Sequence, residues 1–281
     1  WWMTLLTEKC NYAKSPQVDN VIKLMAFKEW FEKKSYRRIS LVSKNAQLAE
    51  AMNLYADELA IGFEWKEIKR QRSTRSLIKR IYYRVPYSLQ AFVWLTRHLI
   101  SHWQLKGVGV EKWRNTKAKT TFISYLFNLE TNSLNRGDFN SSYWTALPHV
   151  MEEHQVETNW LHMYVKHDLL KDANSACSVI KKFNQSHFDT QTHVTLHTFL
   201  GFRLVLLVLG DWYKLFRLRQ QFYQQIQVKS AHLWPLFKRD SQLSIIGKTA
   251  MHNLLYLRLF EEAMSDLPTQ NKGCYLQENQ G

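Results

Sequence analysis

Two carboxylates that directly follow short apolar runs are the candidate catalytic groups of this chain. Glu130 ends the run that begins at Thr120, and Glu278 follows the run at Cys274. If each run is a strand of an open α/β sheet, its carboxylate lies at the carboxyl end of the strand, where such sheets bind ligands. A carboxylate in that place can act as the general base for an acceptor hydroxyl. For Glu130, the cap of a helix or turn is the alternative.

Asn, Trp and His residues in the same part of the sequence could hold a sugar. On a strand, Asn159 faces one side, while Trp160 and His162 face the other. Imidazole titrates near neutrality, so His162 could meet a phosphate or a carboxylate. Trp144 lies in the polar, aromatic segment before this strand, and Arg114 could clamp an anion with two hydrogen bonds. The alternatives are core packing for the tryptophans, a structural histidine, and a surface ion pair for Arg114.

The sequence contains no glycine-rich phosphate loop and no Cys/His cluster with ligand spacing. His193 and His197 are four residues apart, but they lie in a Thr-rich stretch that we predict to be a strand. The three cysteines, Cys10, Cys177 and Cys274, are far apart in the sequence, which favours a reducing compartment and argues against structural zinc. We therefore expect no metal.

The net charge of +14 is concentrated in one window. Between Lys66 and Lys119 there are 14 Lys and Arg residues against Glu67 and Glu111, a net +12. Such a region attracts phosphate-rich partners, either an anionic membrane surface or nucleic acid. Nucleic acid is disfavoured because the interleaved aromatic residues have helical spacing that is typical of a core. A solvated basic face is the alternative.

Alternating patterns predict an α/β chain with additional long helices. Residues 16–68 have the order helix, strand, helix, strand, with Asn45 as a helix cap and Gly62 as a helix stop. A helical stretch over 73–105 should bend or break at Pro86. We further predict strands over 121–126, 159–165, 193–196 and 274–278, and helices over 141–154, 174–185, 199–229 and 240–265.

Four segments resemble a family of bacterial surface-carbohydrate biosynthesis proteins found with lipopolysaccharide O-antigen and capsule loci. They are FISYLFNLE, YWTALPHVMEEHQVETNWLHMYV, the opening WWMTLLTEK and the ending CYLQENQG. The family is similar to two-domain, GT-B-like glycosyltransferases, including retaining transferases of the sialic-acid-like sugar Kdo. The resemblance implies a Rossmann-like, acceptor-side lobe over residues 1–270, with a basic helical insertion at about 69–119. It also implies that residues 271–281 start a second lobe, which would bind the nucleotide-sugar donor without a metal.

The resemblance implies transfer of a CMP-activated, Kdo-like sugar to a glycan or lipid-linked glycan. We expect a cytoplasmic protein, peripheral to the inner face of the bacterial inner membrane, which the region 66–119 would contact. A nucleic-acid-binding module and a non-catalytic scaffold at the membrane surface remain the alternatives.

Overall fold

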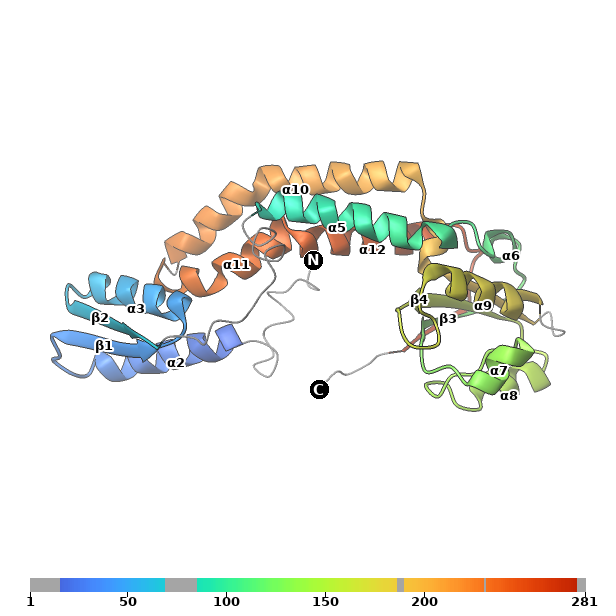
Figure 1. Ribbon diagram of the computed structural model, residues 1–281, viewed down its shortest axis with the longest axis horizontal. Coiled ribbons are helices and arrows are strands. Elements are labelled where there is room, and N and C mark those ends of the chain that lie inside the picture. The colour runs from blue at the N-terminus through green and yellow to red at the C-terminus, as the bar shows by residue number, and fades with distance from the viewer. Residues whose placement is uncertain (1–15, 69–84, 186–189, 230, 277–281) are drawn as a thin grey trace. The chain divides into compact units, whose positions relative to one another are not determined.

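The computed structural model of this chain describes residues 16–68, 85–185, 190–229 and 231–276 (Figure 1). Helices and strands alternate in this part of the chain, and all paired strands are parallel, which confirms the predicted α/β class. The chain forms two compact units. Unit 1 comprises residues 1–95 and 210–254, and unit 2 comprises residues 96–209 and 255–281.

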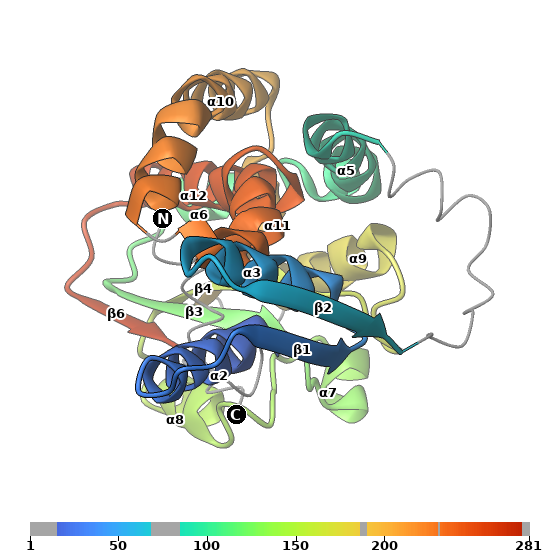
Figure 2. The same cartoon turned by 90° about the vertical axis from the view of Figure 1, so that its left-hand side faces the viewer.

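Unit 1 is built around a β–α–β motif. Its elements are α2 (Pro16–Phe31), β1 (Arg38–Ser43), α3 (Ala46–Glu58), β2 (Gly62–Glu67), η3 (Ala231–Leu233) and α11 (Trp234–Ile245). The two strands pair in parallel and lie side by side next to α2 and α3 (Figure 2). Their shared core contains Leu24, Ile39, Tyr55 and Leu236. These residues come from α2, β1, α3 and α11, so elements from distant parts of the sequence stabilise the core together.

The start of α3 follows the predicted signal, whereas its end does not. The Asn45 side chain accepts hydrogen bonds from the backbone N–H groups of Gln47 and Leu48, at 3.1 and 3.2 Å. This satisfies two donors that the first turn of a helix leaves open. At the other end, the left-handed residue is Ala60, with φ of 52°, and Gly62 already belongs to β2. The prediction that Gly62 ends this helix is therefore wrong.

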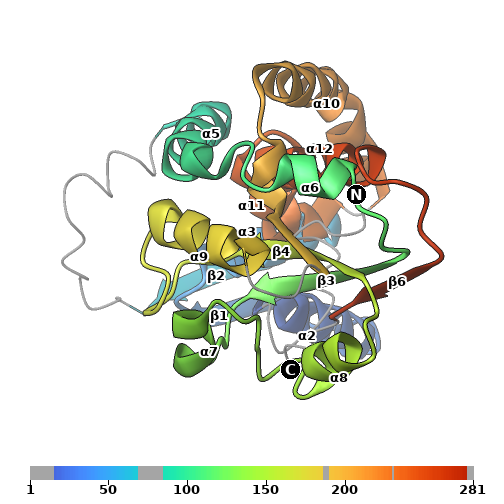
Figure 3. The ribbon, with the colours of Figure 1, turned by 90° about the vertical axis from the view of Figure 1, so that its right-hand side faces the viewer.

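Unit 2 contains a four-stranded parallel sheet with the order β5-β4-β3-β6. Its strands are β3 (Thr120–Leu126), β4 (Thr158–Tyr164), β5 (Gln191–Thr195) and β6 (Lys272–Tyr275). Its shorter helices are η1 (Trp103–Leu105), α6 (Val110–Arg114), α7 (Thr131–Arg136), α8 (Leu147–Glu153), α9 (Ala173–Gln185) and η2 (Leu196–Phe199). Figure 3 shows α6, α7, α8 and α9 near β3 and β4.

One face of this sheet holds the core of unit 2. Phe122, Trp160 and His193 lie opposite one another on β3, β4 and β5. The rings of Phe122 and Trp160 stack with centroids 4.4 Å apart and planes 14° apart. Helices α7, α8 and α9 cover this face with Leu134, Met151 and Phe183, among others. Burial of each such side chain stabilises the fold by about 1.5–3 kcal/mol.

The outer edge of β5 is closed by a side chain. Asn184, near the end of α9, donates from Nδ2 to the His193 carbonyl at 2.7 Å and accepts from the His193 N–H at 2.8 Å. The amide thus replaces the hydrogen bonds that another strand would make. Because an open edge invites pairing with other chains, this contact also protects the sheet.

The long helices start and end at residues that differ in part from the predicted ones. Helix α5 (Tyr87–His102) starts directly after Pro86, and residues 73–84 of the predicted helical stretch lie outside the described residues. Helix α10 (Phe202–Lys229) agrees with the predicted 199–229. The helix predicted over 240–265 is instead two helices, α11 and α12 (Lys248–Ser265), which meet at Gly247. A Cβ atom at Gly247 would lie 2.8 Å from Cα of Leu243, so only glycine fits there.

The predicted division into a lobe over 1–270 and the start of a second lobe over 271–281 differs from the two compact units of the structure. The chain described by the structure forms two units, and their boundaries fall within α5, α10 and α12. Strand β6 pairs with β3 inside the sheet of unit 2, with Phe122 opposite Cys274. It is therefore an edge strand of this sheet. Among the described residues, no helix combines the length and the apolar character that crossing a membrane requires.

Two glycines of unit 2 provide a test of backbone fit. Gly109 has φ of 79°, and a Cβ there would lie 2.7 Å from the His193 carbonyl oxygen. Gly107 has φ of 75°, but a Cβ there meets nothing within 4 Å. The Gly107→Ala change should cost only the left-handed conformation, about 1–2 kcal/mol. The Gly109→Ala change should cost about 1–3 kcal/mol more, because the sheet edge must also move. Urea unfolding of the two variants measures the difference, and equal midpoints would contradict this account.

Candidate functional site

The carboxyl edge of the sheet in unit 2 has the strand arrangement at which parallel sheets bind ligands. The chain passes from β3 to β4 to β5 in one direction, and then places β6 on the opposite side of β3. The strand order therefore reverses between β3 and β6. In open parallel sheets, ligands bind outside the carboxyl ends of the strands at such a reversal.

Glu130 is exposed, and it lies four residues beyond the end of β3 and not directly after the strand. It follows β3 and occupies the N-cap position of α7, but its side chain makes no capping hydrogen bond. Its backbone N–H donates to the carbonyl of Asn140 at 3.2 Å, which ties the two ends of the intervening loop together. Asn128, two residues earlier, is also exposed and has φ of 51°. The carboxylate is thus available to a ligand, while its backbone is fixed.

Three aromatic side chains lie near the same strand end. Phe127, Tyr143 and His167 are each partly buried. The ring of Phe127 meets the His167 ring edge to face at 5.0 Å and lies 6.5 Å from the ring of Tyr143. His167 Nε2 is 3.1 Å from the carbonyl oxygen of Leu126, the last residue of β3. We call Phe127, Tyr143 and His167 the carboxyl-edge aromatic cluster.

The residues predicted to bind sugar from β4 are not exposed. Asn159, Trp160 and His162 are all fully buried. Asn159 bonds to Thr116, to the Ala118 carbonyl and to Gln270, at 2.7, 3.3 and 3.2 Å. In this structure none of the three can contact a ligand, and their side chains belong to the core of unit 2. Both faces of a central parallel strand are covered, so polar residues on it are buried as well.

Trp144 also belongs mainly to the core. It is partly buried, and its ring stands edge to face against Phe122 and Trp160, at 5.3 and 5.5 Å. Its Nε1–H donates to Ser124 Oγ at 2.7 Å, so its polar atom is used within the fold. The helix predicted over 141–154 is reduced to α8, because the chain turns at Thr145 with φ of 49°.

Arg114, another predicted site residue, is not brought to the carboxyl edge. Arg114 ends α6, ahead of β3, and donates from Nε and Nη2 to Asp266 Oδ2 at 2.9 and 2.7 Å. This ion pair raises the pKa of the guanidinium and occupies it with a partner inside unit 2. It agrees with the alternative of a surface salt bridge. Glu278 lies outside the described residues.

A cavity of about 260 Å³ opens at the amino edge, on the opposite side of the sheet. Lys112, Lys117, Glu157 and Thr192 contribute to its lining. One carboxylate and two ammonium groups give it little net charge. Its position at the amino ends of the strands makes it a weaker candidate than the carboxyl edge.

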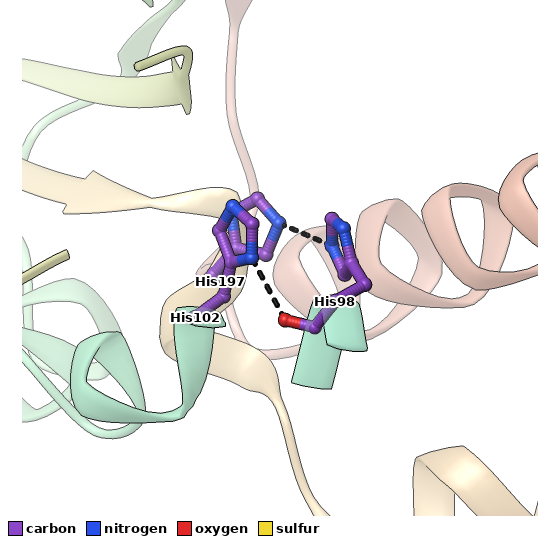
Figure 4. Close-up of side chains that lie close together, drawn as sticks. All are labelled: His98, His102 and His197. Carbon is purple, nitrogen blue, oxygen red and sulfur yellow. Dashed lines mark hydrogen bonds between the residues drawn. The ribbon is translucent and has the colours of Figure 1, made fainter. Parts of the chain in front are cut away.

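Three histidines that the sequence analysis did not single out as a group lie together in unit 2 (Figure 4). His98 and His102 are on α5, and His197 is on η2, directly after β5. His98 and His197 face each other with their Nε2 atoms 3.0 Å apart. The His102 ring stacks on both, with centroid distances of 4.0 and 4.2 Å. We call His98, His102 and His197 the histidine cluster.

The sequence contains a signal for two of the three histidines in this cluster. His98 and His102 are four residues apart in a segment predicted to be helical, which places them on one face. Two histidines at this spacing on a helix are a known arrangement for metal binding. The third ligand was not predictable by spacing, because His197 comes from a distant segment and reaches α5 only through the fold.

A second pair of histidines is buried in the core. His162 Nε2 lies 3.0 Å from His193 Nδ1, and His193 Nε2 lies 3.1 Å from Gln191 Oε1. The planes of the two rings are nearly parallel, with an angle of 2° between them. Burial lowers the pKa of His162 to about 3 and the pKa of His193 well below its usual value. Both imidazoles are therefore neutral in the folded protein.

This pair predicts a pH dependence of stability. An unfolded histidine binds a proton below about pH 6.5, whereas folded His162 stays neutral down to about pH 3. The contribution of neutral His162 to the free energy of unfolding is thus present in full above pH 6.5. It is lost as the pH falls from there toward 3, because the unfolded state binds more protons. Between pH 7.5 and 5.5, His162 alone should account for a loss of about 1.4 kcal/mol in the free energy of unfolding.

The measurement is urea unfolding at both pH values for the wild type, His162→Gln and His154→Gln. His154 is exposed, so its replacement should leave the pH dependence unchanged. His162→Gln should reduce the loss between the two pH values by about 1.4 kcal/mol, whatever its stability at pH 7.5. An unchanged dependence in His162→Gln would show that the ring is not buried in its neutral form.

Comparison of the chain with protein-family models, with curated proteins and with solved structures gives no significant match. These comparisons therefore add nothing to the geometry of unit 2 and to the resemblance in sequence described above. Three features mark its carboxyl edge: the reversal of strand order beside β3, the exposed Glu130 with the carboxyl-edge aromatic cluster, and the histidine cluster after β5.

Proposed function

We propose that unit 2 is the acceptor-side lobe of a glycosyltransferase in bacterial surface-polysaccharide assembly. The observation that carries the proposal is the exposed Glu130 in the loop that follows β3, the strand beside the reversal of strand order. The resemblance in sequence supplies the chemical class, and the sheet supplies an edge of the kind where such chemistry takes place. A Rossmann-like, GT-B-type arrangement with a separate donor lobe is part of this proposal.

The sugar-binding role moves from β4 to the carboxyl-edge aromatic cluster. Sugars present apolar C–H faces and hydroxyl groups, which match a surface of rings with polar ends. Phe127, Tyr143 and His167 offer such a surface next to Glu130, whereas Trp160 is sealed in the core. Trp144 holds the loop of Tyr143 in place through its bond to Ser124. It is therefore a positioning residue for this site.

Glu130 would act as the general base. As the acceptor hydroxyl oxygen forms its bond to the sugar carbon, the bond between that carbon and the donor phosphate oxygen breaks. The hydroxyl proton passes to the Glu130 carboxylate, and the CMP phosphate leaves with the electron pair. A base in this role contributes about 10²–10⁴-fold to the rate. The residues that hold the CMP group would belong to the donor lobe.

The predicted location at an anionic membrane surface is a second part of the proposal. Arg97, Lys117 and Lys119 are exposed in the described part of the basic window. Residues 69–84 of this window are outside the described residues. Each such charge near an anionic leaflet adds about 1 kcal/mol of attraction. The chain should float with vesicles containing anionic lipid in low salt, and not with zwitterionic vesicles. Preferred binding to a random oligonucleotide under the same conditions would favour the nucleic-acid alternative.

The transferase proposal is tested with the full-length protein and membranes of the encoding bacterium as the acceptor source. CMP-activated Kdo with a labelled sugar is the donor probe. Glu130→Gln keeps the size and removes the base, and should lower incorporation by about 10²–10⁴-fold. Glu153→Gln is the matched control, because Glu153 is exposed at the end of α8, ahead of β4. Full activity of Glu130→Gln would remove Glu130 as the base. No incorporation by the wild type would count against this donor.

A further inference from the structure

We propose that the histidine cluster binds one zinc ion through His98, His102 and His197, with a fourth coordination position open to an exchangeable ligand. This inference does not rest on the transferase proposal, since it uses different residues. It also departs from our expectation of no metal, which considered only Cys clusters and the pair His193 and His197.

The positions of the nitrogen atoms carry the proposal. Each of the three histidines offers one ring nitrogen, and these atoms all lie within 4.8 Å of one another. In a tetrahedral zinc site with Zn–N bonds of about 2.0–2.1 Å, the nitrogens are about 3.3 Å apart. The closest pair, Nε2 of His98 and His197, is at 3.0 Å. The other nitrogen distances extend to 4.8 Å, so a bound ion would draw the rings together. The His102 ring, which stacks face to face on the other two, would have to turn so that its nitrogen points at the ion.

The tautomer of His102 is already the one that a metal needs. Its Nδ1 lies 2.8 Å from the backbone carbonyl oxygen of His98, and a carbonyl can only accept a hydrogen bond. Nδ1 therefore carries the proton, and Nε2 keeps its lone pair. Metal-binding histidines commonly donate their second N–H to a carbonyl in this way, which fixes the ring and raises its basicity. Ser101 Oγ, 2.9 Å from the same nitrogen, adds a further contact.

The contact between His98 and His197 also points to a shared cation. Two imidazole nitrogens at 3.0 Å cannot both present lone pairs to each other. A proton on one of them makes the contact a hydrogen bond, and a metal ion can take the place of that proton. The two rings thus converge on one point from different elements, as Figure 4 shows for His98 on α5 and His197 on η2.

The backbone that presents His197 is held firmly. All four residues of η2 are buried. Thr195 and Thr198 form a capping box at its start, and Thr198 Oγ1 donates to the Val108 carbonyl at 3.0 Å. The Gly107 N–H donates to the Thr198 carbonyl at 2.9 Å. His197 is therefore preorganised, whereas His98 and His102 are only partly buried and leave access from solvent.

The ligand set indicates the metal and its chemistry. The cluster consists of histidine alone among the residues that the structure describes. Three neutral imidazoles suit zinc, and they occur in zinc sites that keep a fourth position for water or substrate. With no carboxylate in the set, the bound ion keeps its full positive charge. The fourth ligand should therefore be hydroxide or another small anion, and bound water should lose its proton near neutral pH.

Metal binding by the full chain provides the test. After treatment with a chelator and gel filtration, the protein is dialysed against Zn²⁺, and bound zinc is counted by mass spectrometry. Co²⁺ is the spectroscopic probe, because its visible absorption reports tetrahedral coordination. We expect one ion per chain. His98→Ala and His102→Ala should each weaken binding more than the about 10–100-fold that loss of an outer-shell partner costs.

His154→Ala is the control, since His154 is exposed and lies outside the cluster. It should bind zinc like the wild type. His197 is buried, so His197→Ala is judged only alongside a circular dichroism spectrum that matches the wild type. Stoichiometric binding that survives in His98→Ala and His102→Ala, or a wild type that binds no zinc at micromolar concentration, would overturn the proposal. In that case the cluster is a packing contact alone.

Discussion

The parallel pairing of β3 with β4 is the constraint on which unit 2 depends. Its register places Phe122 beside Trp160 and Ser124 beside His162. The first pair makes the aromatic stack of the core, and the same face receives Trp144, Phe139 and α9. A shift by one residue would turn every one of these side chains to the opposite face. The register also fixes where both strands end, and so where Glu130 stands.

The sequence was informative where local signals agree with the fold. Asn45 predicted the start of α3, and β-branched runs predicted β1 and β3 nearly to the residue. It was less informative where the reason for a residue lies far away. Asn159 looked like a ligand-binding amide, because its partner Gln270 is 111 residues later in the chain. His162 looked like an anion-binding residue for the same reason, since His193 accompanies it only once β4 and β5 are paired.

The candidate site was predictable in part for a similar reason. Glu130 follows from a local pattern, a carboxylate after a strand, and the structure leaves it exposed. The histidine cluster combines a local pattern with a distant residue. One helical turn brings His98 and His102 together, but His197 arrives through β5 and a short helix that follows it. Spacing alone therefore gives two ligands of a possible three, which is too few to specify a metal site.

The order of the strands also bears on how the two proposed sites relate. Glu130 follows β3, and His197 follows β5, with β4 between them. Neighbouring strands lie about 4.8 Å apart, so the two strand ends are separated by about 10 Å. Glu130 lies in the loop after β3, and His197 lies on η2 after β5, so the two proposed sites use different loops of the carboxyl edge. They share no residue, and the two activities should be separable by mutation. A zinc ion at the cluster would act on unit 2 through its own fourth ligand.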